Sequence, residues 1–291
     1  MTLAEVLIAA ALTAGVVAGV FAAAGPAQAS FATDQERADL QQRLRVAVDT
    51  LTRDLRAAAF VRPHRLGAVG DDPAAGIHFR PDAVTIVFPD PLVVRPTDDR
   101  RRSYYLGADG GVSQLMQFDG IETALPVLDD VVALGFEYFG ESQPPQTLPL
   151  DDAGRPAVPV SYGPSPPALT VDDPNDAWGP GENCTFGVVG GRHVPRLAAF
   201  AGTAPVPLPA ALLADGPWCT DAGNADRFDA DLLRVRLVRV RLRLQARAPF
   251  RGASGLLFLH PGTALEIRRS VPDQEVRVDV ALRNWNAGRW R

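Results

Sequence analysis

The chain contains no lysine, and all 29 of its basic residues are arginine. Aspartate and glutamate number 34, so the formal net charge is -5 at neutral pH. A protein that binds nucleic acid through its overall charge needs a basic surface, because contacts to phosphate supply most of the affinity. The composition therefore argues against nucleic acid as a partner.

Cysteine is scarce as well, with Cys184 and Cys219 as the two copies in 291 residues. No C-x-x-C, H-E-x-x-H or paired-histidine spacing accompanies them, so the sequence lacks the usual zinc-site patterns. In exported proteins an even pair of cysteines favours a disulfide. Closing the loop of 34 residues between them would stabilise the fold by roughly 3–4 kcal/mol on the chain-entropy model.

Motifs of catalysis are missing too. The sequence has no G-x-S-x-G, no phosphate-binding loop and no dinucleotide-binding fingerprint. Its four histidines are scattered, with no cysteine or serine motif beside them: His64, His78, His193 and His260. We predict that the protein is not an enzyme, and we assign no catalytic residue and no cofactor.

One acidic segment offers weak candidates for a calcium site. Its oxygen-bearing side chains are Asp221, Asn224, Asp226 and Asp229. Ca²⁺ prefers such oxygen ligands, but the spacing matches no EF-hand loop. Because Asp and Asn are common turn formers, we expect an acidic turn without metal here.

The longest apolar run lies at the beginning of the sequence, where residues 1–24 carry a single charged side chain, Glu5. About 20 apolar residues can span the roughly 30 Å core of a bilayer as a helix. A carboxylate within such a span is costly and should have a partner. We predict a transmembrane helix over residues 1–28, with Glu5 paired to the free amino group of Met1 on a neighbouring subunit.

A cleaved secretory signal is the first alternative for this segment. Ala27-Gln28-Ala29 resembles a signal-peptidase site before Ser30. However, no basic side chain precedes the apolar run, the run exceeds the usual length, and Glu5 fits poorly within it. The second alternative, an ordinary membrane anchor, leaves the carboxylate unexplained.

The segment from Thr2 to Ala9, TLAEVLIA, resembles the mature N-terminus of type IV pilins and pseudopilins. Members of that superfamily carry a methylated first residue, usually phenylalanine, after a prepilin peptidase removes a short basic leader. The resemblance implies that Met1 is the processed and methylated residue and that Glu5 sets the subunit register during assembly. Met1 is equally compatible with the initiator of a truncated start.

The next segment, residues 29–62, is predicted to form an amphipathic helix. Its apolar side chains recur at helical spacing: Leu40, Leu44, Val48, Leu51 and Leu55. Thr33 or Asp34 would cap its start, and we expect it to end near Phe60. Gly25-Pro26 should kink or briefly break the connection to the first helix.

Within this helix, LQQRLRVAVDTLTRDLRAAAF resembles the corresponding region of PilW-type minor pilins and of J-type pseudopilins of type II secretion. On physical grounds Arg53 and Asp54 are expected to be solvated helix charges. The motif therefore supports a subfamily and does not define a site.

Residues 63–291 are predicted to form a β-rich head, which makes the chain an α+β protein. An antiparallel meander should pack on the apolar face of the helix. Its expected strands are 76–80, 83–88, 103–106, 112–118 and 131–139. From about residue 140 to 231 the periodicity disappears, and the Pro- and Gly-rich sequence is typical of an irregular insertion.

Sheet patterning returns at residues 232–247 and 275–285. The first of these segments changes phase near Leu237-Val238, which predicts a bulge or a strand break there. We expect its arginines to line a solvated sheet face: Arg234, Arg236, Arg239, Arg241 and Arg243. The two strands resemble the last strands of PilW-type minor pilins.

The resemblance implies a minor pilin or pseudopilin, a structural subunit that primes or caps a type IV pilus or a type II secretion pseudopilus. Such a subunit sits in the inner membrane with one pass and a periplasmic head, and then joins a filament in the periplasm or at the cell surface. Its expected partners are other major and minor pilins or pseudopilins, the inner membrane and the prepilin peptidase. Two alternatives stay open: an exported adhesin or binding module with a cleaved signal peptide, and a DNA-uptake pseudopilin.

Overall fold

The computed structural model describes residues 2–58, 60–63, 82–88, 100–109, 112–119, 124–146, 161–171, 178–221, 224–246, 260–261, 268–269 and 271–283. The chain divides into two compact units, residues 1–46 with 244–274 and residues 47–243 with 275–291. One long N-terminal helix and several antiparallel sheets make the protein α+β, as predicted.

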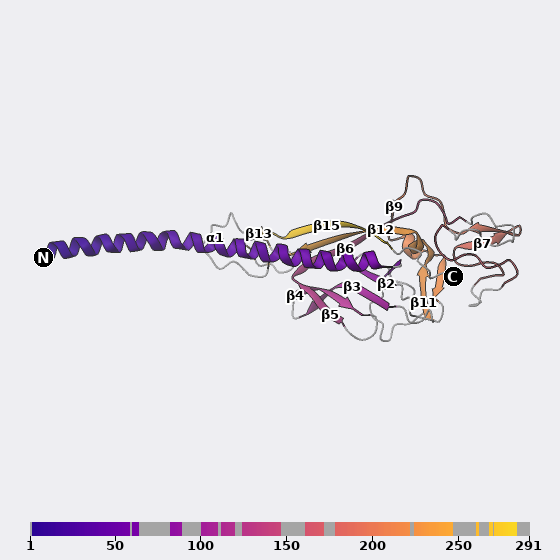
Figure 1. The fold of residues 1–291 in the computed structure, drawn as a ribbon, viewed down its shortest axis with the longest axis horizontal. Coiled ribbons are helices and arrows are strands. Elements are labelled where there is room, and N and C mark those ends of the chain that lie inside the picture. The colour runs from indigo at the N-terminus through magenta and orange to yellow at the C-terminus, as the bar shows by residue number, and fades with distance from the viewer. Residues whose placement is uncertain are drawn as a thin grey trace. The chain divides into compact units, whose positions relative to one another are not determined.

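Helix α1 runs from Leu3 to Ala57 without interruption (Figure 1). The break expected at Gly25-Pro26 is therefore wrong, and so is a helix start at Thr33 or Asp34. Proline removes one backbone hydrogen bond, and the alanine-rich turns on both sides carry the helix past it. The helix is long and apolar enough near the N-terminus to cross a membrane, a criterion that a signal sequence also meets.

A five-stranded antiparallel meander forms one sheet, in the order β1-β2-β3-β4-β5. Its strands are β1 (Phe60–Pro63), β2 (Ala83–Phe88), β3 (Arg100–Asp109), β4 (Val112–Phe118) and β5 (Ala124–Asp129). The predicted strands 83–88, 103–106 and 112–118 are confirmed, whereas 76–80 lies outside the described residues. Sequence patterning missed β5, because Pro126 demotes a strand pattern that an edge strand nevertheless tolerates.

A four-stranded sheet has the order β15-β12-β6-β9. Its strands are β6 (Val131–Gly140), β9 (Val206–Leu208), β12 (Val235–Leu244) and β15 (Gln274–Ala281). Strand β6 also contacts β2, β3 and β4, so the two sheets meet along it. The predicted strand 131–139 is confirmed, and the final strand ends four residues before Trp285, which lies outside the described residues.

The region predicted to be irregular contains regular elements. Besides β9 it holds the hairpin of β7 (Phe186–Val189) and β8 (Arg192–Pro195), and the hairpin of β10 (Trp218–Asp221) and β11 (Asn224–Asp229). The turn expected across the acidic segment is therefore a strand pair. The region also contains two 3-10 helices. Helix η3 (Leu212–Ala214) lies between β9 and β10, and helix η4 (Ala230–Arg234) follows β11. Strands of three to six residues are too short to give a periodic signal in the sequence. A separate short pair joins β13 (His260–Pro261) to β14 (Arg268–Arg269).

The arginine-rich segment differs from prediction in two ways. Its first residues belong to η4, and β12 then runs unbroken from Val235, so the expected strand break is wrong. The predicted change in the phase of the buried positions is confirmed, since Val235 is buried and burial then alternates from Val238 onward. Arg234 is fully buried, which overturns its place on a solvated face, whereas Arg241 is exposed as predicted.

Candidate functional site

The N-terminus of α1 is closed by a reciprocal pair of contacts between Thr2 and Glu5. The Thr2 backbone N–H donates to Glu5 Oε2 at 2.8 Å. The Glu5 N–H lies 3.4 Å from Thr2 Oγ1 and donates to the Thr2 carbonyl at 3.1 Å. This arrangement is a capping box, which satisfies backbone donors that the first helical turn leaves unpaired. Met1, the predicted partner of Glu5 on another subunit, lies outside the described residues.

The capping box gives Glu5 a local role that the sequence interpretation missed. Its signal was present, because Thr2-Leu3-Ala4-Glu5 fits the S/T-x-x-E pattern that begins many helices. A carboxylate in the first turn also interacts favourably with the positive end of the helix dipole. Glu5 therefore has one structural function within its own chain, and any role between subunits would be additional.

The apolar side chains of the first part of α1 are exposed. Leu3 is 82% exposed and Phe21 is 73% exposed, and the other large ones share this state: Val6, Leu7, Ile8, Leu12, Val16, Val17, Val20 and Phe31. A continuous apolar surface of this length is unfavourable in water and needs a covering of lipid or protein.

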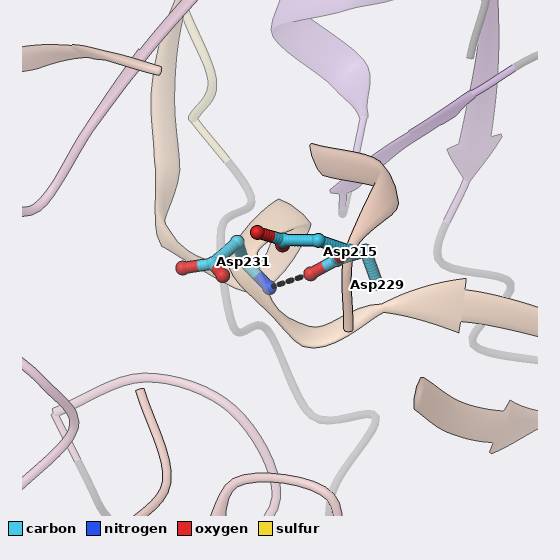
Figure 2. A group of neighbouring side chains, drawn as sticks. All are labelled: Asp215, Asp229 and Asp231. Carbon is cyan, nitrogen blue, oxygen red and sulfur yellow. Dashed lines mark hydrogen bonds between the residues drawn. The ribbon is translucent and has the colours of Figure 1, made fainter. Parts of the chain in front are cut away.

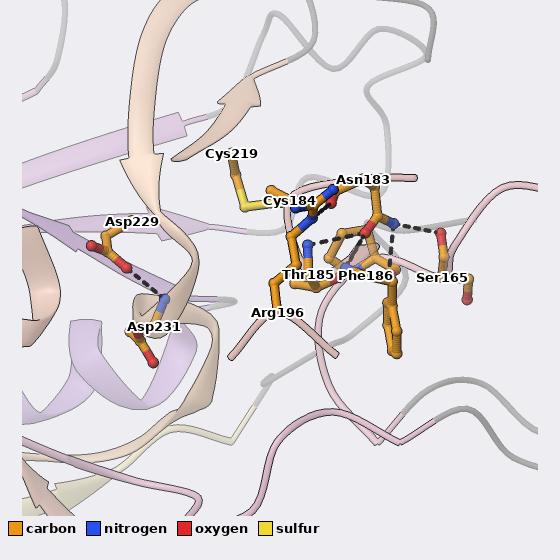
Figure 3. The surroundings of a disulfide bond; sticks show 10 residues. Ser165, Asn183, Cys184, Thr185, Phe186, Arg196, Cys219, Asp229 and Asp231 are labelled. Carbon is orange, nitrogen blue, oxygen red and sulfur yellow. Dashed lines mark hydrogen bonds between the residues drawn. A yellow bond between two sulfur atoms is a disulfide. The ribbon is translucent and has the colours of Figure 1, made fainter. Parts of the chain in front are cut away.

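The predicted disulfide between Cys184 and Cys219 is present, and both cysteines are buried (Figure 3). It joins the loop before β7 to strand β10. Asn183 organises that loop, since its Oδ1 accepts the Phe186 N–H at 2.9 Å and its Nδ2 donates to the Ser165 carbonyl at 3.0 Å. The covalent bond therefore connects two segments that each have local hydrogen bonding of their own.

Beside this disulfide lies an acidic corner formed by Asp215, Asp229 and Asp231 (Figure 2). One carboxylate oxygen from each side chain lies within 4.8 Å of the other two. Among the described residues, this group includes Asp229 but none of the other three calcium candidates. Those three, Asp221, Asn224 and Asp226, lie on β10 and β11. Sequence spacing did not point to Asp215, because η3 and the β10–β11 hairpin bring it to the corner.

The two buried carboxylates of this corner are held by hydrogen bonds and by an ion pair. Asp229 accepts the Gly216 N–H at 2.6 Å and the Asp231 N–H at 2.8 Å. Asp231 Oδ1 lies 2.8 Å from Arg234 Nε without hydrogen-bond geometry, so this contact is an ion pair. Burial raises the pKa of Asp229, and it raises that of Asp231 to about 7 although Arg234 opposes the shift. The corner thus has structural partners for both buried acids.

Arg234 is the centre of this arrangement. Its side chain is fully buried, its Nη2 donates to the Ala198 carbonyl at 2.9 Å, and its guanidinium lies 4.5 Å from the ring centroid of Phe200. The backbone carbonyl of Arg234 accepts the Glu141 N–H at 3.0 Å. One residue, through its side chain and its backbone, therefore links η4, the end of β6 and the loop before β9.

A second buried polar cluster fixes the end of α1. Asp54 is 6% exposed, which overturns the prediction that it is a solvated helix charge, whereas Arg53 is exposed as expected. Asp54 Oδ2 accepts the Arg102 Nη1 and the Tyr104 hydroxyl, each at 2.5 Å. The same hydroxyl lies 3.1 Å from Gln117 Oε1. Desolvation is the main cause that raises the pKa of Tyr104, and the hydrogen bond to Asp54 is the second. The Tyr104 hydroxyl therefore stays protonated and remains a donor.

Comparison of the chain with family models, with curated proteins and with solved structures finds no match.

Proposed function

We propose that this protein is a minor pilin or pseudopilin, a structural subunit that primes or caps the assembly of a type IV pilus or a type II secretion pseudopilus. The observation that carries the proposal is the exposed apolar surface of α1, which has a single acidic side chain in its first turn. Before assembly the helix lies in the inner membrane and the β-rich head lies in the periplasm. During assembly, helices of neighbouring subunits replace lipid around the same apolar surface.

Glu5 gives this packing its axial register. Thr2 engages Oε2 of the carboxylate, and the negative charge remains for the terminal ammonium of Met1 on a neighbouring subunit. Within a filament core, removing one partner of such a pair would strand a buried charge at a cost of roughly 3–5 kcal/mol. Register is thus set by a charge pair, while the apolar surface supplies most of the attraction.

The capping box makes a sharp test possible, because its acid position accepts Gln as well as Glu. Glu5→Gln keeps the cap and removes the charge, Glu5→Ala removes both, and Thr2→Ala weakens the cap and keeps the charge. Each variant of the full chain would be produced in the native cell. Membrane fractionation measures insertion, and immunoblotting of purified filaments measures incorporation.

We expect all three variants to insert into the membrane. We expect Glu5→Gln and Glu5→Ala to be lost from filaments and Thr2→Ala to be incorporated. Wild-type incorporation of Glu5→Gln would show that Glu5 acts through the helix cap alone, and the register mechanism would then be wrong.

The arginine-rich strand β12 gives little support to the alternative that the protein is a DNA-uptake pseudopilin. Arg236 lies 2.5 Å from Glu141, and Arg239 contacts Asp279 through two nitrogens, at 2.7 and 3.0 Å. Arginines that already pair with carboxylates offer less positive potential to a phosphate backbone. The adhesin alternative depends on cleavage before Ser30, which lies within the continuous helix α1.

A further inference from the structure

The last turns of α1 bury a narrow strip of side chains. The buried residues between positions 47 and 58 are Ala47, Leu51, Asp54, Leu55 and Ala58. At about 100° per residue these positions cover an arc of roughly 100° around the helix. Asp54 lies at one edge of the arc and Leu55 at the other. Asp54 is the one charged side chain in this strip.

The apolar members of the strip do not define the rotation of the helix about its own axis sharply. Contacts of leucine and alanine are non-directional, and their energy depends mainly on the area removed from water. The residues that flank the strip are half-buried and small or β-branched: Val48, Thr50, Thr52 and Ala57. A modest rotation would exchange one such side chain for another. The two-residue connection from Ala57 to Phe60 limits sliding along the axis, but it does not limit rotation.

Asp54 behaves differently, because its hydrogen bonds are directional and reach two side chains of β3. Rotation that moves Asp54 outward would break the short hydrogen bond from the hydroxyl of Tyr104, a fully buried residue, and would leave that hydroxyl the longer contact to Gln117 Oε1 at 3.1 Å. Rotation in the other direction would carry the carboxylate deeper and away from Arg102, whose side chain is 38% exposed. Both displacements remove a hydrogen bond or an ion pair from a buried polar group, which is costly.

We propose that Asp54 is a positioning residue that fixes the rotational setting of the last three turns of α1 on the five-stranded sheet. The inference does not depend on the proposed role in a filament. Buried polar groups often cost stability yet select one arrangement among several that apolar packing permits. Arg102 and Tyr104 are the matching groups on the sheet.

The test measures the rotational setting of the last turns of α1 separately from the stability of the fold. Spin labels would be placed on the full chain in detergent through Asp49→Cys, on the exposed side of α1, and Leu125→Cys, on β5. The native cysteines remain in their buried disulfide. Pulsed electron spin resonance then gives the distribution of distances between the two labels. Thermal unfolding of the same samples reports stability.

We expect one narrow distance distribution for the parent, and a broad or multiple distribution for Asp54→Leu combined with Tyr104→Phe, without loss of the folded state. Asp54→Asn, made alone with Tyr104 in place, keeps an acceptor for the Tyr104 hydroxyl and should give the narrow distribution of the parent. Thr50→Val, which changes the flank of the strip and leaves the polar cluster intact, is the matched control and should remain narrow.

A narrow, unshifted distribution in the folded double variant would overturn the proposal, because apolar packing alone would then set the rotation. If the double variant does not fold, Tyr104→Phe alone carries the test. That variant should broaden the distribution partially, and an unchanged width would be equally decisive against the proposal.

Discussion

Arg234 Nε lies 2.8 Å from Asp231 Oδ1, and both side chains are almost completely shielded from solvent. The two residues are three positions apart on η4, so a single turn of 3-10 helix presents the acid and the base to each other. Asp229 caps the same helix by accepting the Asp231 N–H. The buried charge of Arg234 therefore depends on an acid that the same helix positions.

At pH 9, above the pKa of about 7 that Asp231 has beside Arg234, Arg234→Met should lower the free energy of unfolding by about 3–5 kcal/mol, because Asp231 is then buried without the cation that favours its ionised form. Adding Asp231→Leu should recover part of this loss, since no charge then remains unpaired. Urea unfolding of the single and double variants measures both effects. Arg241→Met, at an exposed position of β12, is the control and should change stability by less than about 0.5 kcal/mol. A double variant as unstable as Arg234→Met would contradict the ion-pair explanation.

The stability of the head should depend on pH through Asp231. Its pKa is raised from 3.8 in the unfolded chain to about 7 in the fold, so the native state holds a proton that the unfolded state has lost. Stability from this group is therefore greatest and constant below about pH 4, falls as the pH rises from about 4 to 7, and levels off above about 7. For one proton the slope is at most about 1.4 kcal/mol per pH unit.

The measurement is the difference in unfolding free energy between the parent and Asp231→Asn at pH values from 5 to 8. Comparing the two proteins removes the contributions of groups they share. The difference should change with pH up to about 7 and be constant above it. Parallel curves across the whole range would show that Asp231 does not titrate there.

Replacing both cysteines by serine, Cys184→Ser with Cys219→Ser, should lower the free energy of unfolding by roughly 3–4 kcal/mol, because the unfolded chain regains the entropy of a 34-residue loop. The hydrogen bonds of Asn183 should keep the loop before β7 partly ordered. Denaturation with and without reductant measures the effect. The reduced parent should match the variant, and equal stability of the oxidised parent and the variant would exclude a stabilising role for the bond.

The N-terminal peptide of protein purified from native membranes should begin at Met1, carry a methyl group on its amine and retain the apolar helix. Mass spectrometry of that peptide measures all three properties. A terminus at Ser30 would identify a conventional signal peptide and would remove Glu5 from the mature protein. The filament proposal would then give way to the exported binding module.

The sequence by itself determined the helical character of the N-terminal segment, the strands β2, β4 and β6, and the disulfide, whereas the continuity of α1 past Pro26 came from the structure. Apolar side chains at helical spacing in the second half of α1 and alternating ones in β6 report burial of one face, and short runs rich in β-branched and apolar residues mark β2 and β4. Both signals are local properties of consecutive residues. A pair of cysteines with no other copy in the chain allows a single intramolecular bond. Each of these features depends on neighbours in sequence or on simple counting.

Only the tertiary structure decided the state of the charged residues. Asp54 and Arg53 are adjacent in sequence, yet Asp54 is buried because Arg102 and Tyr104, about 50 positions away, supply its hydrogen bonds. Arg234 continues an alternating strand pattern, but η4 turns it toward Asp231 and the Ala198 carbonyl. Whether a charge stays in water depends on partners that lie distant in sequence, and periodicity carries no information about them.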